Sequence, residues 1–519
     1  METSQPRTLR RLFSRFPGDV LTQIPDIEVT GVTHDSRRVK PGDLFVAVVG
    51  DSSDGHDYIS QAAEGGALAV VGRRDLSGIG LPYVRVGQDR LALAYLAAAF
   101  FGSPALDMAV IGVTGTDGKT TTANLIYSIF QAAGLPVGMI TTVNARIGGQ
   151  ELDTGFHVTT PDAPDVQAYL AQMRAAGITH VILEATSHGL AQERLRACEF
   201  DVGVVTNITH EHLDYHGSYE AYRAAKGRLF RELGRTGTKR VNTPRAAVLN
   251  RGDQSYEYLI GQTAVRPIAY GDHPQADIRA ADVRPHPGGQ DFTIVGPGYR
   301  HPAKTNLPGA YNIANCLAAA AAAHEVFGID LDAVSAGIAD LAPIPGRMEV
   351  IALGQDFTAI VDFAHTPNAL KRSLEAVRPM TDGRIIAVFG SAGLRDRQKR
   401  RMMAEIAVQL ADFTVLTAED PRTESLEGIL AEMAAGAASR GGVEGKSFVR
   451  IPDRGEAIRY AIEIAAPGDL VIAEGKGHEQ SMCFGVTEYP WDDRTAMRAA
   501  LSEHLGVPGP EMPRLPTST

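Results

Sequence analysis

Apolar residues recur along most of the chain in two patterns, which are short β-branched runs and longer segments with apolar residues three or four positions apart. The run at 110–113 has the first pattern, and the segment at 120–131 has the second. A turn with two glycines lies between them. This order predicts a buried strand, a tight turn and a helix.

The alternation of strand and helix continues along the chain and predicts parallel sheets covered by helices. A proline-rich segment at 343–346 interrupts it. The other strands that we predict before this break are 180–184, 202–207 and 246–250. After the break we predict strands at 358–362, 385–389, 414–416 and 470–473, and helices at 368–378, 396–410, 426–437 and 455–465. The second series is typical of a doubly wound domain.

The beginning of the chain has a pattern of its own, with a strand at 43–50, an apolar run at 67–71 and an alanine-rich helix at 90–101. A Gly-Ser-Pro segment at 102–104 marks its end. We therefore predict an α/β fold with three domains and a flexible tail, at 1–105, 106–344, 345–507 and 508–519.

Composition narrows the class of protein. The 519 residues are 44% hydrophobic and 21% charged, as in a globular protein, and the net charge of -11 argues against a nucleic-acid partner. No apolar run reaches the length of about eighteen residues that a membrane span needs. The three cysteines are far apart, and residues 1–16 lack a secretion signal. We predict a monomeric protein of the cytoplasm.

The turn after the first strand has the chemistry of a phosphate-binding loop. Gly115 and Gly118 let backbone amides converge on an anion at the N-terminus of the following helix. Lys119 can reach the terminal phosphates, and Thr120 offers a hydroxyl to magnesium. The general P-loop pattern has a glycine where Val113 stands, so this loop is a variant, and an ordinary glycine turn is the alternative.

Acidic and basic residues follow the next two predicted strands. Glu184 ends one strand, where it can meet the loop of a neighbouring strand and hold magnesium. The loop after 202–207 contains His210, His212 and His216, which fit either a zinc site or one magnesium ligand among hydrogen-bonding neighbours. Their spacing favours magnesium. Lys226 lies in a predicted helix, where a lysine is usually a surface charge.

Short motifs extend this pattern over nearly the whole chain. They are Asp35-Ser-Arg37, Pro41-Gly-Asp-Leu-Phe-Val-Ala47, Thr114-Gly-Thr-Asp-Gly-Lys-Thr-Thr121, Thr159-Thr-Pro161, Glu184-Ala-Thr-Ser-His188, Thr206-Asn-Ile208 with His212-Leu-Asp214, Ala224-Ala-Lys226, Leu307-Pro-Gly-Ala-Tyr-Asn-Ile-Ala-Asn315, Pro345-Gly-Arg-Met-Glu349, Asp362-Phe-Ala-His-Thr-Pro367, Asp420-Pro-Arg422 and Gly475-Lys-Gly-His-Glu479. By these motifs, and by their order, the chain resembles the Mur ligases, and within that family the enzymes that form the UDP-linked tripeptide.

The resemblance implies an N-terminal UDP-binding α/β domain, a central P-loop ATPase with a parallel sheet, and a C-terminal Rossmann-like domain. It also implies a reaction of peptidoglycan precursor synthesis. ATP phosphorylates the D-glutamate carboxylate of UDP-MurNAc-L-Ala-D-Glu, and the amine of a diamino acid attacks the acyl phosphate. The products are the amide, ADP and phosphate.

The resemblance assigns roles to individual residues of this chain. The catalytic residues are Lys119, Glu184, His212 and Lys226. ATP is held by Gly115, Thr116, Asp117, Gly118, Lys119, Thr120, Thr121, Asn312, Arg347 and Asp362. Two Mg²⁺ ions are held by Thr120, Glu184, His212 and Lys226, the last as a carbamate. The UDP-MurNAc-dipeptide contacts Ser36, Asp51, Ser52, Ser53, Thr159, Thr160, Thr186, Gln192 and Arg194. The amino-acid pocket contains Arg395, Asp420, Arg422, Gly475 and Glu479.

Three residues depart from the family pattern. Val158 stands where an asparagine often precedes the threonine pair. Asp117 replaces the usual asparagine and brings a negative charge beside phosphates. Asp420 also stands where asparagine is common, and its charge would favour the plain ammonium of lysine or ornithine. Arg422 is retained and would pair with the distal carboxylate of meso-diaminopimelate, which we therefore favour.

Other functions stay open at this point. Another amide ligase of the superfamily, of the folylpolyglutamate or cyanophycin type, would not need Asp35-Ser-Arg37. A P-loop ATPase without ligase activity would not need the motifs at 420–422 and 475–479. A zinc hydrolase built on His210, His212 and His216 is the most distant alternative.

Overall fold

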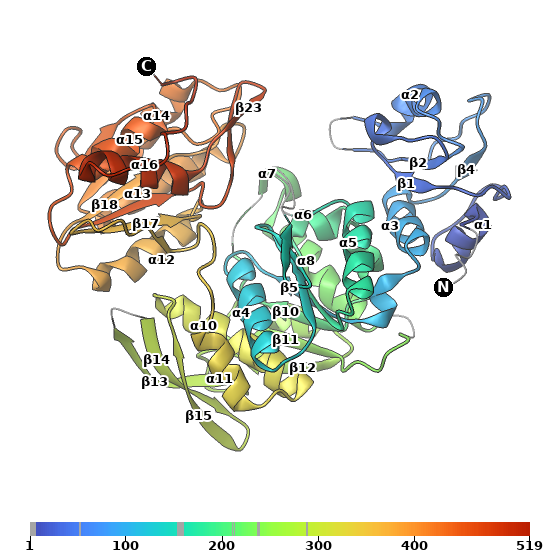
Figure 1. Ribbon diagram of the computed structural model, residues 1–519, viewed down its shortest axis with the longest axis horizontal. Coiled ribbons are helices and arrows are strands. Elements are labelled where there is room, and N and C mark those ends of the chain that lie inside the picture. Colours follow the sequence, from blue (N-terminus) through green and yellow to red (C-terminus); the bar gives the residue numbers. More distant parts are fainter. Residues whose placement is uncertain are drawn as a thin grey trace.

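The computed structural model describes residues 7–50, 53–152, 160–209, 211, 213–235, 239–286 and 289–518. It consists of three α/β units in chain order, and the first and last lie on opposite sides of the central one (Figure 1). This architecture, in which each unit has a mainly parallel sheet, confirms the predicted fold class.

The first unit is built on a four-stranded parallel sheet in the order β1-β2-β3-β4. Alternate residues of β2 face opposite sides, with Leu44 and Val46 toward α1 and α3, and Phe45 and Ala47 toward α2. The elements are β1 (Gly31–Thr33), β2 (Asp43–Ala47), β3 (Ala69–Gly72), β4 (Tyr83–Arg85), α1 (Leu9–Leu12), α2 (Ile59–Glu64) and α3 (Asp89–Phe100).

The central unit has an eight-stranded sheet in the order β12-β11-β10-β5-β9-β6-β7-β8, parallel from β12 to β6. Strand β5 lies near its middle, so the loop that follows β5 has neighbours on both sides. The strands are β5 (Ala109–Thr114), β6 (Val137–Ile140), β7 (Ala145–Ile147), β8 (Gln150–Leu152), β9 (His180–Glu184), β10 (Val202–Val205), β11 (Ala246–Asn250) and β12 (Arg266–Tyr270).

Helices cover both faces of this sheet. Ile111 and Val113 of β5 pack with α4, α10 and α11, whereas Val110 packs with α5 and α8, because successive strand residues point to opposite faces. The helices are α4 (Lys119–Ala132), α5 (Ala163–Ala175), α6 (Ser187–Ala191), α7 (Leu213–His216), α8 (Tyr219–Leu233), α9 (Tyr256–Ile260), α10 (Ala310–Ala320) and α11 (Leu331–Ala339).

A three-stranded antiparallel sheet, which the sequence did not predict, leads from the central sheet to α10. It consists of β13 (Arg279–His286), β14 (Gly289–Gly296) and β15 (Tyr299–Thr305). Most residues of β13 are exposed. Because neither face of that strand is buried, it lacks the alternation of apolar and polar residues that identifies a strand.

The third unit has a six-stranded sheet in the order β16-β17-β21-β18-β19-β20, in which only β16 is antiparallel to its neighbour. Its strands are β16 (Glu349–Val350), β17 (Thr358–Asp362), β18 (Ile385–Phe389), β19 (Phe413–Leu416), β20 (Phe448–Arg450) and β21 (Leu470–Glu474), with a hairpin of β22 (Ser481–Phe484) and β23 (Thr487–Pro490). The helices are α12 (Pro367–Val377), α13 (Arg397–Leu410), α14 (Leu426–Ser439), α15 (Arg454–Glu463) and α16 (Asp493–Leu505).

The C-terminal segment differs from the flexible tail that we expected. Residues 508–518 contain no helix or strand, but Leu515 is buried in the core of the third unit. Thr517 Oγ1 and Ser518 Oγ donate hydrogen bonds of 2.8 and 2.9 Å to Asp453 Oδ2. The segment therefore packs against its domain.

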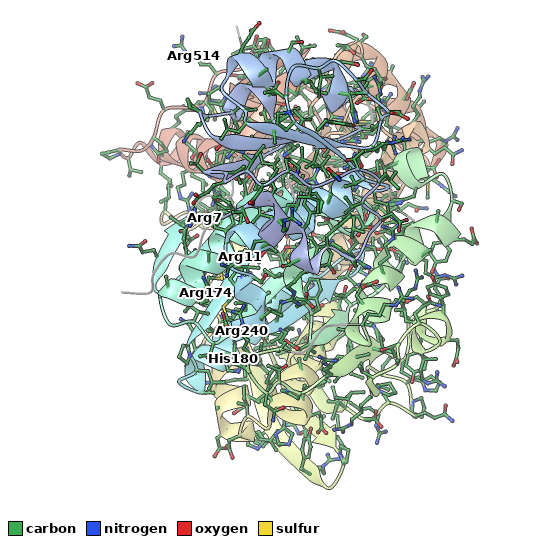
Figure 2. The ribbon with its side chains drawn as sticks, turned by 90° about the vertical axis from the view of Figure 1, so that its right-hand side faces the viewer. Arg7, Arg11, Arg174, His180, Arg240 and Arg514 are labelled. Carbon is green, nitrogen blue, oxygen red and sulfur yellow. The ribbon has the colours of Figure 1, made fainter. Side chains whose placement is uncertain are left out.

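Two arginines fix the linker between the first and second units. Arg174 and Arg240, both labelled in Figure 2, bind Asp107 Oδ2 at 3.2 and 2.8 Å. Both also donate to the carbonyl oxygen of Gly102.

No helix in the described part of the chain is long and apolar enough to span a membrane.

Candidate active site

The loop between β5 and α4 has the geometry of an anion cradle. Gly115 and Gly118 adopt φ angles of +147° and +79°, which residues with a side chain rarely adopt. A Cβ atom at Gly115 would lie 1.9 Å from Thr206 Oγ1, and one at Gly118 would lie 2.5 Å from Asn315 Oδ1. Glycine is therefore required at both positions. Helix α4 begins at Lys119, so its free N-terminal amides face the loop.

The end of the neighbouring strand β10 holds the loop in shape. Thr206 Oγ1 and Asn207 Nδ2 donate to the carbonyl oxygen of Asp117 at 2.6 and 3.1 Å. Asn207 Oδ1 accepts from the Asp117 amide at 3.2 Å. These contacts orient the backbone and leave the Asp117 side chain free to point elsewhere.

Thr120 and Glu184 come together as the strand order predicts. Thr120 Oγ1 donates to Glu184 Oε2 at 2.9 Å, and both side chains are buried. The amide of Thr142, which follows β6, donates to the same carboxylate oxygen at 3.1 Å. Lys119 Nζ lies on the loop itself, where it donates to the Thr116 carbonyl at 2.7 Å. A hydroxyl and a carboxylate of this kind are suitable ligands for Mg²⁺.

Lys226 is not a surface charge. It is 1% exposed, and its Nζ donates to the carbonyl oxygen of Gly115 at 2.6 Å. The same atom lies 4.5 Å from the centre of the Tyr222 ring. Burial, and next the nearby Lys119 ammonium, hold the pKa of Lys226 well below its ordinary value. The side chain is therefore a buried amine that readily becomes neutral.

Glu211, to which sequence reasoning gave no role, connects the loop to the third unit. Tyr222 Oη lies 3.0 Å from Thr116 Oγ1 and donates to Glu211 Oε2 at 3.5 Å. His365 Nε2, from the third unit, lies 3.4 Å from Glu211 Oε1. In the sequence, Glu211 stands between two histidines. We considered those histidines only as metal ligands and gave the acid no role.

Three further predicted nucleotide-binding residues come from different elements. Asn312 lies in α10 of the second unit, Arg347 lies just before β16, and Asp362 ends β17 of the third unit. Arg347 Nη2 donates to Thr120 Oγ1 at 3.4 Å, and its guanidinium lies 4.3 Å from the centre of the Phe363 ring. Asp362 accepts from the backbone amides of Met348 and Ala364 at 2.7 and 2.9 Å. Asn312 Nδ2 donates to the Pro308 carbonyl at 2.7 Å.

Three of the described residues predicted to contact the dipeptide are linked by hydrogen bonds, and a fourth, Gln192, bonds to a tyrosine. Thr160 Oγ1 and Thr186 Oγ1 are 2.8 Å apart, and Arg194 Nη1 donates to the Thr160 carbonyl at 2.7 Å. Gln192 Nε2 donates to Tyr215 Oη at 3.2 Å.

Ser36 and Ser53, predicted to contact UDP, both belong to the first unit. Ser36 Oγ donates to Gln61 Oε1 at 2.7 Å, and the Ser53 carbonyl accepts from the Gly50 amide at 2.8 Å. The predicted site residues Asp51, Ser52, Thr159 and His212, together with His210, lie outside the described residues.

The predicted amino-acid pocket contains a buried lysine that we had not singled out. Lys476 Nζ binds Asp420 Oδ1 at 3.0 Å and Glu479 Oε2 at 2.5 Å. The Cys483 amide also donates to Asp420 Oδ1, at 2.9 Å. Burial opposes the charged carboxylate, but Lys476 and the Cys483 amide outweigh it and hold the pKa of Asp420 below its ordinary value. Its negative charge is thus compensated within the protein.

The other pocket residues lie on loops beside this pair. Arg422 has a φ angle of +52°, and its Nη1 donates to the Gly393 carbonyl at 2.9 Å. Gly475 has a φ angle of +109°, and a Cβ there would lie 2.5 Å from Glu419 Oε2. Arg395 belongs to the loop 390–396 between β18 and α13.

Within the described ranges, no three His, Cys, Asp or Glu side chains form a group that could hold a metal ion. The zinc alternative was built on His210, His212 and His216, and the first two lie outside those ranges.

Family models match most of the chain. The description "Mur ligase middle domain" applies to residues 113–323, "Mur ligase, glutamate ligase domain" to 346–477, and "Mur ligase family, catalytic domain" to 28–100. A UDP-N-acetylmuramyl-tripeptide synthetase from Roseiflexus sp. (strain RS-1) is 44% identical, over 93% of this chain and 96% of the relative.

Two diaminopimelate ligases are also similar. The UDP-N-acetylmuramoyl-L-alanyl-D-glutamate–2,6-diaminopimelate ligase of Geobacillus thermodenitrificans is 41% identical, over 95% of this chain and 99% of the relative. A solved structure with the same enzyme description is 30% identical and has a TM-score of 0.65. The match covers 96% of this chain and 99% of the chain in that structure.

Proposed function

The chain belongs to the Mur ligase family, and we infer that it is an ATP-dependent ligase of peptidoglycan precursor synthesis. It adds a diamino acid to UDP-MurNAc-L-Ala-D-Glu and releases ADP and phosphate. Relatives with these enzyme names align over nearly the whole chain. This full-length similarity, together with Lys119, Thr120, Glu184 and Lys226 around one loop, carries the proposal.

The first step brings a carboxylate to a polyphosphate, and cations must cancel the repulsion between them. Lys119 follows the loop and its Nζ lies within it, so it supplies one fixed positive charge. The oxygens of Thr120 and Glu184, 2.9 Å apart, would hold Mg²⁺, and His212 would hold a second ion. Bound magnesium would neutralise the phosphate charge.

Lys226 would act as a carbamate. A neutral amine can add to CO₂, whereas an ammonium cannot, and the buried Lys226 has a lowered pKa. The amine nitrogen forms a bond to the carbon of CO₂ and releases one proton, so the product carries a negative charge. Its oxygens would provide ligands beside Gly115.

The second step needs the amino acid held by the third domain. An arginine pairs well with a carboxylate, and an acid with an ammonium, so Arg395, Arg422 and Glu479 suit a molecule with both groups. The Lys476 ammonium already compensates the negative charge of Asp420. The carboxylate therefore gives less reason to expect the side-chain ammonium of lysine or ornithine at that position. We therefore propose meso-diaminopimelate, with lysine and ornithine as the alternatives.

The two steps involve different domains, so the domains must approach one another during the reaction. The Thr120 contact of Arg347 and the Glu211 contact of His365 already join the phosphate loop to the third unit. We propose that the enzyme works as a monomer in the cytoplasm, where ATP and the UDP-linked substrate are available.

The test is phosphate release by the purified protein with ATP, UDP-MurNAc-L-Ala-D-Glu and one diamino acid. Release should require both co-substrates, and meso-diaminopimelate should react faster than lysine or ornithine in parallel assays. ATP hydrolysis that is indifferent to both co-substrates would instead indicate an ATPase without ligase activity.

A further inference from the structure

The short helix α6 connects two groups of residues that we propose for dipeptide binding. Thr186 caps its N-terminus, because Thr186 Oγ1 accepts from the Gly189 amide at 3.1 Å. Gln192 and Arg194 follow its C-terminus, with Glu193 between them in a left-handed conformation at φ +58°. A five-residue helix has few internal hydrogen bonds, so its position depends on contacts with its neighbours.

Arg228 of α8 supplies such contacts at the C-terminal end of α6. Its Nη1 donates to the carbonyl oxygens of Leu190 and Ala191 at 3.2 and 3.1 Å. The same nitrogen binds Glu193 Oε1 at 2.9 Å. A cation at a helix C-terminus satisfies free carbonyl groups and interacts favourably with the helix dipole. Arg228 therefore holds the backbone on both sides of the turn that presents Gln192 and Arg194.

Helix α8 links this turn to the phosphate loop. Lys226 and Arg228 are two residues apart, so they lie on nearly opposite sides of α8. Lys226 binds the Gly115 carbonyl on one side, and Arg228 binds the end of α6 on the other. One helix, α8, therefore contacts both the phosphate loop and the turn proposed to bind the dipeptide.

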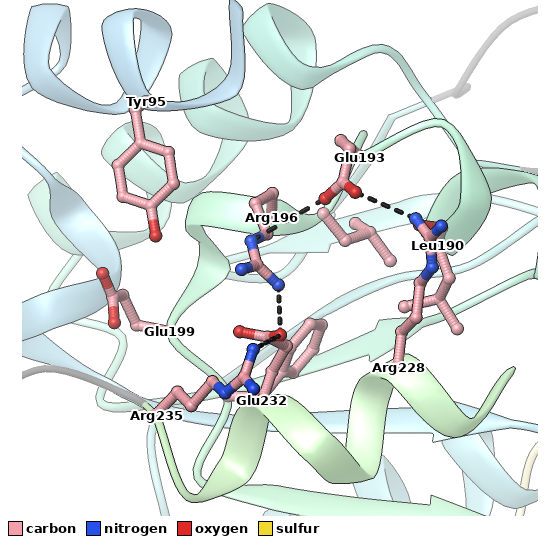
Figure 3. Close-up of a pocket in the computed structure, with 10 residues that line it drawn as sticks. Tyr95, Leu190, Glu193, Arg196, Glu199, Arg228, Glu232 and Arg235 are labelled. Carbon is pink, nitrogen blue, oxygen red and sulfur yellow. Dashed lines mark hydrogen bonds and ion pairs between the residues drawn. The ribbon is translucent and has the colours of Figure 1, made fainter. Parts of the chain in front are cut away.

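A small cavity beside α6 shows how Glu193 is held. Glu193 lies between Arg228 and Arg196, whose Nε is 3.7 Å from Glu193 Oε2 (Figure 3). Arg196 in turn pairs with Glu232 of α8. Arg235 lines the same cavity and lies 3.7 Å from Glu232. Glu193 is therefore bound through two arginines to α8.

We propose that Arg228 is a positioning residue for the dipeptide substrate, acting through the C-terminus of α6 and through Glu193. It does not touch the nucleotide or the reacting atoms. It places Gln192 and Arg194 where the muramoyl-dipeptide binds, so that the D-glutamate carboxylate is aimed at the phosphate site. The proposal rests on the function proposed above.

The experiment measures steady-state kinetics with each substrate varied in turn. For Arg228→Ala, the KM for UDP-MurNAc-L-Ala-D-Glu should rise about tenfold, because charge-assisted contacts to three acceptors are lost. The KM for ATP should stay within about twofold of the wild-type value, because the Lys226 side of α8 is unchanged. Arg228→Lys, which keeps the charge and one donor group, should recover part of the loss.

Two further variants separate positioning from a general loss of structure. Arg235→Ala removes an arginine that lines the same cavity but pairs with Glu232, and it should leave all three KM values unchanged. Glu193→Gln keeps the size of the side chain and the Arg228 contacts to α6, and it should raise the KM for the UDP substrate about threefold. If Arg228→Ala does not fold, the KM of Glu193→Gln for the UDP substrate tests the proposal instead.

The proposal is overturned if the KM for the UDP substrate is unchanged in both Arg228→Ala and Glu193→Gln. It is also overturned if all three KM values rise equally, or if Arg235→Ala has the same effect as Arg228→Ala. If the wild-type protein itself fails to consume UDP-MurNAc-L-Ala-D-Glu, the proposed function is wrong, and this inference falls with it.

Discussion

Asn368, the second residue of α12 in the third domain, donates a hydrogen bond of 3.0 Å from Nδ2 to Oδ2 of Asp117 in the phosphate loop. The Asp117 carboxylate is therefore directed toward the neighbouring domain. Burial, and next the Glu211 carboxylate, raise its pKa above the ordinary value. The residue that departs from the family pattern in the loop thus forms a contact between domains.

Asp117→Asn should bind nucleotide more tightly. The amide keeps an oxygen that can accept from Asn368 but removes a negative charge close to the phosphate loop. We expect the Kd for ATP to fall about threefold at low ionic strength, and less at high ionic strength because salt screens the repulsion. Titration calorimetry at two salt concentrations measures this. Asp282→Asn, on β13, is the control, because it also replaces an acid by an amide. Weaker ATP binding by Asp117→Asn would contradict the prediction.

Lys226→Ala should lose most activity, with about a hundredfold lower kcat, because the proposed carbamate ligand to magnesium is removed. A small carboxylate such as formate or acetate should restore part of it by occupying the space of the proposed carbamate. Phosphate-release assays with and without acetate measure the effect. Lys371→Ala, on the exposed side of α12, provides a control, since its ammonium pairs with the exposed Glu375. Full activity of Lys226→Ala would refute the role.

Asp420→Ala should destabilise the third domain. It removes a partner of the buried Lys476, which then keeps only Glu479, and we expect a loss of about 2 kcal/mol in the free energy of unfolding. Asp420→Asn keeps an oxygen for Lys476 and the Cys483 amide and should lose less. Urea unfolding measures both. Equal stability of Asp420→Ala and the wild type would show that the pair contributes nothing.

Glu424 should make the loop 390–396, which carries Arg395, sensitive to acid. Its carboxylate accepts from Arg400 Nη2 at 2.9 Å and from the Leu394 amide, next to Arg395. The hydrogen bond from Arg400 contributes most to lowering its pKa from 4.5 to about 2. A lowered folded-state pKa stabilises the protein above the unfolded value, and this stabilisation is lost as pH falls from about 4.5 to about 2.

Glu424→Gln tests this dependence. At neutral pH the variant should be less stable by about 1 kcal/mol, a value reduced by solvent screening of the pair. The difference from the wild type should shrink as the pH approaches 2. Unfolding measured across that range checks the prediction, and a difference that does not change with pH would contradict it. The KM for the diamino acid should also rise, because the loop that carries Arg395 is held less firmly.

Local features of the chain were accessible from the sequence. The β5 strand, the glycine loop and the α4 helix were predicted together, because periodicity and glycine placement are properties of neighbouring residues. The meeting of Thr120 and Glu184 was also predicted, since parallel strands end at one edge of a sheet. By contrast, β13 was missed because most of its residues are exposed.

Only the tertiary structure decided which side chains meet. Asn368 is separated from Asp117 by 251 positions, and Lys476 from Asp420 by 56. No local pattern links such residues, because the pairing is set by how sheets and helices pack. For the same reason the family resemblance identified Lys226, Gln192 and Arg194 but not the role of Arg228. The contacts of Arg228 exist only once α6 lies against α8. Sequence determined the elements and the chemical groups they carry, and packing determined the distances between them.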